Sequence, residues 1–132
     1  MKVELRHAPL PWIGAIAWHY WFVVCDETGR HRWEVWQTKN AGGRLCIGHV
    51  HCDLKAPDDG VGGGASRLAC QWDGAKALKL AKVLENVQDY PFCERYRLWP
   101  GPNSNSFVAW VLREAGVEFA LDPRGIGRGY FR

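Results

Sequence analysis

The sequence lacks a long hydrophobic segment. No apolar run reaches the roughly 18 residues that a membrane-spanning helix requires. The first ten residues include Lys2, Glu4, Arg6 and His7, whereas a secretory signal peptide would have an apolar core there. We therefore expect no transmembrane segment, no secretory signal and a cytoplasmic location.

Paired cysteines and a strong charge of one sign are also missing. The five cysteines are an odd number and form no C-x-x-C pair, which favours free thiols over a disulfide framework. The net charge is only +3, and the arginines that gather near the C-terminus are Arg124, Arg128 and Arg132. A nucleic-acid-binding domain would have a stronger basic stripe, so we expect no nucleic-acid partner.

No phosphate-binding or metal-binding motif is complete. The Gly-rich segment 57–65 has no Lys after its glycines, so it predicts a flexible surface loop rather than a phosphate cradle. His49 and His51 would share one face of a strand and could bind a metal together. Zinc sites use three or four ligands in a recognisable spacing, so we expect no metal and no cofactor.

The composition is that of a globular protein with many tryptophans. Hydrophobic residues make up 47% and charged residues 23% of the 132 residues, which argues against disorder. This length suits one domain, so we expect residues 1–132 to form a single domain. Eight tryptophans are unusual for this size, and they indicate either core packing or an aromatic-lined cleft.

Apolar periodicity predicts an α+β fold, a small antiparallel sheet packed by two main helices. Turn signals at 26–29 and 40–43 separate three expected strands. A helical pattern follows the Gly-rich segment, and Pro91 ends it. A second helix is apolar on most of its surface, so it should be buried and end before Gly116. The expected strands are 13–25, 30–37 and 44–54, and the expected helices are 73–90 and 106–115.

Ser104 stands where the second helix begins, after an extended turn enforced by Pro100 and Pro102. The first turn of a helix has unpaired backbone N–H groups and a dipole that favours negative charge. This environment suits a nucleophile or an oxyanion. A plain helix cap is the alternative, since Asn103 and Ser104 are both favoured cap residues.

His19 lies in the middle of an apolar segment, where an unpaired imidazole would be costly. We assume that Cys25 pairs near Arg30 in the first hairpin. His19 then faces about Trp36, and Glu34 is diagonal to it on the same face. A carboxylate beside an imidazole sets its tautomer and raises its basicity, so Glu34 is the expected orienting group. A one-residue shift in register would separate the two, and a structural histidine is the alternative.

The segment Trp99-Pro-Gly-Pro-Asn-Ser-Asn-Ser-Phe107 resembles the signature of an uncharacterised bacterial family. Members of that family carry Trp-Pro-Gly-Pro-Asn-Ser-Asn-Thr-Phe, so Ser106 stands where they have Thr. Weaker matches extend the resemblance over nearly the whole chain. They are His19-Tyr-Trp21, Glu34-Val35, Tyr90-Pro91 and Gly125-Ile-Gly127.

A more distant similarity is to circularly permuted papain-like hydrolases, the NlpC-type and lecithin:retinol acyltransferase-like enzymes. Those enzymes have a His on an early strand and a later Asn-Cys-x-x-Phe motif that opens a helix. Asn103-Ser-Asn-Ser-Phe107 matches the motif with Ser104 in place of the Cys, and His19 matches the strand His. The similarity implies a permuted papain-like arrangement. A Ser hydroxyl, unlike a helix-terminal thiol, needs a well-placed base.

These observations lead to two hypotheses for function. The first is a hydrolase or acyltransferase-like enzyme that acts on an amide or ester, with His19, Ser104 and Glu34 as catalytic residues. The second is a catalytically inactive papain-like module that binds a peptide, lipid or protein partner. The side chains expected to contact a substrate are Trp21, Trp99, Asn103 and Asn105.

Overall fold

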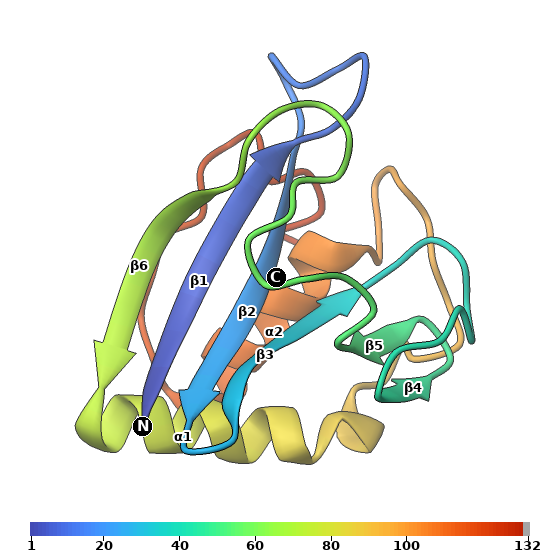
Figure 1. The fold of residues 1–132 in the computed structure, drawn as a ribbon. Coiled ribbons are helices and arrows are strands. Elements are labelled where there is room, and N and C mark those ends of the chain that lie inside the picture. Colours follow the sequence, from blue (N-terminus) through green and yellow to red (C-terminus); the bar gives the residue numbers. More distant parts are fainter. Residues whose placement is uncertain (131–132) are drawn as a thin grey trace.

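The computed structural model describes residues 1–130, which form an antiparallel sheet with two α-helices against it (Figure 1). The six strands have the order β4-β5-β3-β2-β1-β6 across the sheet, and each neighbouring pair is antiparallel. The expected small α+β fold is confirmed. The strands are β1 (Lys2–Pro9), β2 (Trp18–Asp26), β3 (Gly29–Val35), β4 (Leu45–Ile47), β5 (Val50–Cys52) and β6 (Arg67–Asp73), and the helices are α1 (Gly74–Glu85), the 3₁₀-helix η1 (Val87–Asp89) and α2 (Ser104–Ala115).

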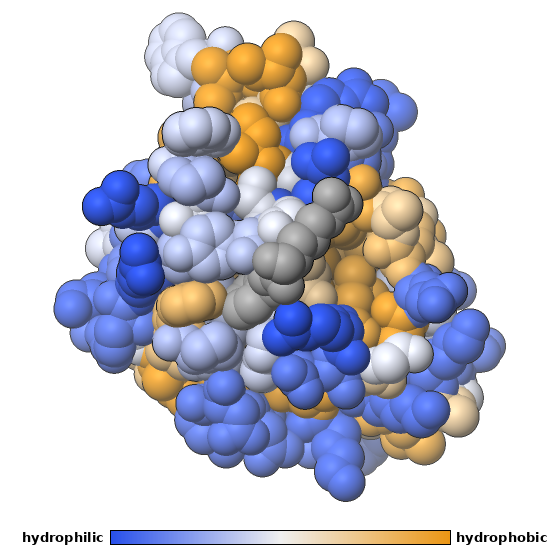
Figure 2. Space-filling model, turned by 180° about the vertical axis from the view of Figure 1, so that it is seen from behind, coloured by the Kyte–Doolittle hydropathy of each residue, from blue (hydrophilic) through white to orange (hydrophobic). Residues whose placement is uncertain are grey.

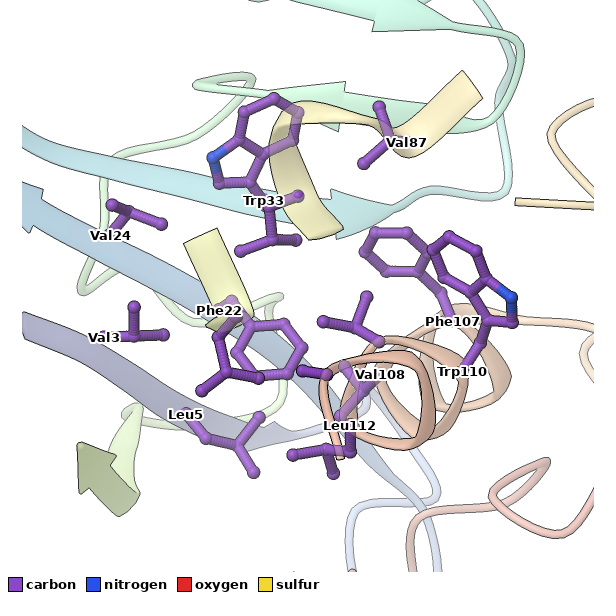
Figure 3. Close-up of a cluster of buried hydrophobic side chains, with 14 of the residues drawn as sticks. Val3, Leu5, Phe22, Val24, Trp33, Val87, Phe107, Val108, Trp110 and Leu112 are labelled. Atoms are coloured by element: carbon purple, nitrogen blue, oxygen red, sulfur yellow. The ribbon is translucent and has the colours of Figure 1, made fainter. Parts of the chain in front are cut away.

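The two α-helices and one face of the sheet enclose the main hydrophobic core (Figures 1 and 3). Strand residues two apart share a face, so Val3 and Leu5 of β1 enter this core together. Phe22 and Val24 of β2 do the same. α2 is buried on most of its surface, as its sequence predicted. Its core side chains include Phe107, Val108, Trp110, Val111 and Leu112.

α2 begins two residues earlier than expected, at Ser104, because Asn103 is its N-cap. The Asn103 side chain accepts hydrogen bonds from the backbone N–H groups of Asn105 and Ser106. The Ser106 hydroxyl accepts one from the Asn103 N–H, which completes a capping box. At the other end Gly116 adopts a left-handed conformation with a φ of 66° and ends the helix, as predicted.

α1 is shorter than the expected helix 73–90, because the helix breaks at Asn86. Val87 in η1 is as well buried as Leu84 in α1, so the apolar periodicity runs through the break and does not reveal it. Asp73 occupies the N-cap position, as expected, but its side chain makes no cap hydrogen bond. None of the helices within residues 1–130 has the length and apolar character to cross a bilayer.

The expected strand 13–25 is wrong at its start. β2 begins at Trp18, and residues 10–17 form an apolar loop between β1 and β2. The Leu10 N–H donates to the Ala17 carbonyl and closes this loop. Trp12 has a φ of 69°, which lies outside the range that strands use. A continuous apolar run does not distinguish a buried strand from an apolar loop.

The expected strand 44–54 is also wrong, because the chain reverses inside it. β4 and β5 pair with each other around Gly48, which has a φ of 58°. A Cβ at this position would collide with the Cys93 carbonyl, so the turn requires glycine. The sequence pattern also missed β1 and β6, and β6 is a largely exposed edge strand.

The Gly-rich segment 57–65 belongs to a long connection that crosses the face of the sheet opposite the helices (Figure 1). The Trp21 indole N–H donates to the Pro57 carbonyl. The Arg32 guanidinium donates to carbonyls of Ala56 and Asp59. The segment lies at the surface, as predicted, but buried side chains of the sheet anchor its beginning.

Candidate active site

β2 and β3 separate where the candidate site forms. Their ladder contains the pair Cys25–Arg30, as the sequence analysis assumed, and it stops at Phe22. Beyond this point β3 pairs with β5 on its other side and diverges from β2 (Figure 1). His19 then lies beside Trp36, and the two rings meet edge to face with their centroids 5.7 Å apart.

Three polar side chains form a continuous hydrogen-bonded chain in this gap. Ser104 Oγ lies 2.8 Å from His19 Nδ1, and His19 Nε2 lies 2.7 Å from Glu34 Oε1. The exposed fractions are 7% for Ser104, 4% for His19 and 0% for Glu34. The side chains come from α2, β2 and β3. The structure thus brings the three candidate residues together, and their catalytic roles stay a prediction.

The charge state of Glu34 decides the direction of these hydrogen bonds. Burial by itself would raise the pKa of Glu34, but the His19 hydrogen bond and the charges of His19 and Arg32 outweigh it and lower that pKa. An ionised carboxylate only accepts hydrogen bonds, so His19 Nε2 carries a proton and donates it. In the neutral imidazole Nδ1 is then an acceptor, and the Ser104 hydroxyl donates to it.

Arg32 lies behind Glu34 and has no exposed surface. Its Nε forms an ion pair of 2.7 Å with Glu34 Oε2, and a terminal nitrogen donates to Oε1 at 2.9 Å. The guanidinium also stacks on Trp21, 3.9 Å from the ring centroid. Sequence reasoning missed Arg32. A signal was present, because residues two apart on a strand share a face and Arg32 precedes Glu34 by two positions.

Ser104 is the first residue of α2 and is not its cap. The side-chain and carbonyl oxygens of Asn103 accept hydrogen bonds from the N–H groups of Asn105, Ser106 and Phe107, and they pass over that of Ser104. The N–H of Ser104 has no acceptor within residues 1–130, and it stands at the positive end of the helix dipole. The structure thus leaves both the hydroxyl and the N–H of Ser104 free of the capping role.

Asn105 ties α2 to β2 on either side of His19. Its Oδ1 accepts a hydrogen bond of 3.0 Å from the Tyr20 N–H, and its Nδ2 donates one of 2.8 Å to the Trp18 carbonyl. The same Nδ2 donates to the Ile126 carbonyl. These β2 groups lie beyond the end of the ladder with β3, so the Asn105 amide pairs them and holds the helix N-terminus against the strand.

The four residues expected to contact a substrate lie in different environments. Trp21 has no exposed surface and packs against His19, with ring centroids 5.5 Å apart. Asn103 and Asn105 line the cavity at the site, but they are buried and their amide groups bond to the protein. Trp99 lines the same cavity and is largely exposed. Among the four, Trp99 alone has substantial free surface for a substrate to cover.

Two adjoining cavities lead to the Ser104–His19 pair. One of about 150 Å³ is lined by both residues, and one of about 330 Å³ reaches His19 from the side of Trp36. The walls come mainly from loop 10–17 and segment 96–99. The lining residues that the two cavities share are Leu10, Ile13, His19, Tyr96 and Leu98. The site is therefore a narrow, mostly apolar cleft with a polar floor.

His49 and His51 do not share one strand face, because His49 lies in the turn before β5. His49 Nδ1 donates to the Trp36 carbonyl, and His51 Nδ1 donates to the His49 carbonyl. His51 Nε2 accepts the Ala41 N–H. Within residues 1–130 no three His, Cys, Asp or Glu side chains are grouped to hold a metal ion.

Comparison with known proteins identifies the family of the chain. The sequence model of a family described as "Protein of unknown function (DUF3750)" matches residues 1–130. No curated protein and no solved structure matches the chain. The matched region contains the whole described sheet, both α-helices and the Ser104–His19–Glu34 chain. A match of this extent shows that the chain belongs to the DUF3750 family.

Proposed function

We propose that the chain is an acyl-transfer enzyme, a hydrolase or acyltransferase that cleaves an amide or ester with Ser104 as nucleophile. The observation that carries the proposal is the hydrogen-bonded chain from Ser104 through His19 to Glu34. A nucleophile, a base within reach of it and a carboxylate that orients the base are the parts that serine acyl transfer requires.

The first half of the reaction acylates Ser104. Its Oγ attacks the carbonyl carbon of the substrate while its proton moves to His19 Nδ1. The carbonyl oxygen becomes an oxyanion, and the free Ser104 N–H at the helix N-terminus is a donor for it. The bond to the leaving oxygen or nitrogen then breaks, and that atom takes the proton from His19. Glu34 stabilises the imidazolium that forms in between.

The second half releases the acyl group. Water, or the hydroxyl of an acceptor molecule, gives a proton to His19 Nδ1 and attacks the acyl carbon. The bond to Ser104 Oγ breaks, and the proton returns from His19 to that oxygen. Water yields a carboxylic acid, and an acceptor alcohol yields a new ester, so one site supports both hydrolysis and acyl transfer.

The order of the elements supports a permuted papain-like arrangement of this site. The base lies on an early strand, β2, and the nucleophile lies at the N-terminus of a late helix, α2. The imidazole presents Nδ1 to the nucleophile and Nε2 to the carboxylate. A chymotrypsin-type triad uses the two nitrogens in the opposite sense, which argues against a chymotrypsin-like origin for the arrangement.

A catalytically silent cleft that binds a peptide, lipid or protein partner is the second candidate. Two observations favour it: Ser104 stands where the permuted enzymes have a more reactive Cys, and less than a tenth of its surface is exposed. Both candidates use the same cleft. They differ in whether the Ser104 hydroxyl is activated.

Labelling with a fluorophosphonate separates the two candidates. The enzyme should be labelled at Ser104, and Ser104→Ala should abolish the label. His19→Ala should slow it by at least about a hundredfold, the usual contribution of a general base. Glu34→Gln keeps the size of the side chain but removes the carboxylate that fixes the His19 tautomer, so it should also slow labelling strongly. No labelling of the wild type would contradict an activated hydroxyl.

A thiol at the same position is the second readout. Ser104→Cys should react rapidly with iodoacetamide at neutral pH, because the helix N-terminus and His19 favour its thiolate. Ser66→Cys places a thiol in the Gly-rich connection, where Ser66 is only partly buried, and is the matched control. A fast thiol in the Ser104→Cys variant, without labelling of the wild type, would support the silent cleft. A slow thiol that is indifferent to His19→Ala would contradict both candidates.

A further inference from the structure

Two exposed apolar loops border the opening of the cleft. Loop 10–17 contains no charged side chain, and neither does segment 98–102 opposite it. We call the exposed side chains of these loops the apolar rim: Trp12, Ile13, Ile16, Leu98 and Trp99. Figure 2 shows hydrophobic surface at the end of the molecule where Figure 1 places loop 10–17. Small proteins rarely gather exposed apolar residues in this way unless the surface contacts something.

The apolar rim is continuous with the interior of the cleft. Trp12 and Ile13 line the larger cavity, and Ile13, Leu98 and Trp99 line the smaller one. Trp12 is fully exposed and has a φ of 69°. This left-handed conformation is rare for a bulky residue, and such strain is concentrated at functional sites.

Basic side chains flank the apolar rim. Arg97 directly precedes Leu98, and Arg67 of β6 lies opposite His7 in the β1–β6 ladder, near the end of β1. Neither forms an ion pair with an acidic side chain within residues 1–130. Arg124 stacks on Trp18 at the base of loop 10–17, and it forms an ion pair with Asp122.

We propose that the apolar rim docks on an anionic lipid bilayer and that the cleft takes its ester or amide substrate from that surface. Tryptophan is favoured at a membrane interface because its ring is apolar and its N–H is polar. Isoleucine and leucine side chains beside it insert below the headgroups, and arginines at the edge bind anionic headgroups. An acyl chain then enters the apolar cleft directly from the bilayer, without crossing water.

The docking surface stands on the exposed side chains and charges alone, whereas the substrate class rests on the proposed function. Docking is therefore tested with the Ser104→Ala protein, which does not turn over lipid. The assay is co-sedimentation with vesicles of phosphatidylcholine, with or without phosphatidylglycerol. The protein should bind the vesicles that contain phosphatidylglycerol and bind the neutral vesicles more weakly.

Variants of the apolar rim give the decisive comparison. A Trp12→Ser and Ile16→Ser double change should lower vesicle partitioning at least about tenfold, because it removes two inserting side chains. Trp99→Ser on the opposite loop should also weaken binding. Leu78→Ser on α1 is the matched control, since Leu78 is 58% exposed and Ile16 64%, and it should change nothing. Arg97→Gln should lower binding to anionic vesicles about fivefold.

Each outcome bears on docking separately from catalysis. Absence of vesicle binding, or binding that survives the double change and Trp99→Ser, overturns docking. Sedimentation velocity tests the other occupants. A dimer that the double change disrupts, without vesicle binding, assigns the rim to a second copy of the chain and overturns the proposal. Vesicle binding without fluorophosphonate labelling supports the docking surface and contradicts the proposed enzyme activity. Labelling without vesicle binding supports the enzyme activity and overturns docking.

Discussion

Replacement of Arg32 by methionine tests the electrostatic design of the site. Arg32→Met removes a buried guanidinium while it keeps much of the apolar side chain. The change leaves the Glu34 carboxylate buried without its Arg32 partner, and it leaves the Asp59 carbonyl without the donor that Arg32 supplies. Breaking a buried ion pair on one side costs about 3–5 kcal/mol. A loss of this size in a protein of 132 residues lowers the melting temperature by roughly 10–20 °C.

The pH dependence of this loss follows from Glu34. In the wild type the lowered pKa of Glu34 means that its stabilising contribution is present above the unfolded value and fades as pH falls. Without Arg32 the pKa of Glu34 is lowered less, so the buried carboxylate contributes less stability at neutral pH. The variant therefore loses most stability at neutral pH. Its difference from the wild type in the free energy of unfolding narrows as the solution becomes acidic.

Urea unfolding followed by tryptophan fluorescence measures both quantities, since the chain has eight tryptophans. Glu34→Gln is the matched partner change. The double variant Arg32→Met with Glu34→Gln should be more stable at neutral pH than Arg32→Met alone, because no unpaired charge remains. The reasoning is refuted if Arg32→Met costs less than about 1 kcal/mol. A difference from wild type that stays constant between neutral and mildly acidic pH would refute it as well.

Three further predictions concern the support of the site. Asn105→Ala leaves the Tyr20 N–H and two carbonyls unpaired, so urea unfolding should show a loss of about 2–4 kcal/mol. Gly127→Ala places a methyl group against the Asn103 side chain at a φ of 96°, so it should destabilise the cap of α2, and hydrogen exchange should speed up in its first turn. All five native cysteines are free, and burial raises the pKa of Cys52 to about 11, so peptide mapping after alkylation at mildly alkaline pH should find the exposed Cys46 modified and Cys52 protected.

The resemblance of the sequence to known families pointed to Ser104 and His19 as candidate residues, and the structure brings the two into contact. The motif around Ser104 marked the helix start, and the hairpin between β2 and β3 has the register that Cys25 and Arg30 suggested. That register alone placed Glu34 near His19. Short-range rules suffice for such features, because caps, turns and strand alternation are set by residues that are close in sequence.

The same rules failed where one sequence pattern is compatible with two different local structures. The apolar segment before Trp18 predicted strand, yet it forms the loop that carries most of the apolar rim. The segment 44–54 predicted one strand, yet it folds back at Gly48 because of a close approach to Cys93. Hydrophobicity indicates which residues avoid water, but it does not say whether the sheet, a helix or another molecule covers them.

The sequence by itself determined the small α+β fold, the buried second helix and the residues Ser104, His19 and Glu34 as candidates. Only the tertiary structure decided that these three touch, because Ser104 and His19 are 85 residues apart. It also decided that Asn103 and not Ser104 caps α2, and that Arg32 lies behind Glu34. Such contacts depend on how the N-terminus of α2 packs against β2 and β3 where these strands diverge. No local sequence pattern encodes that packing.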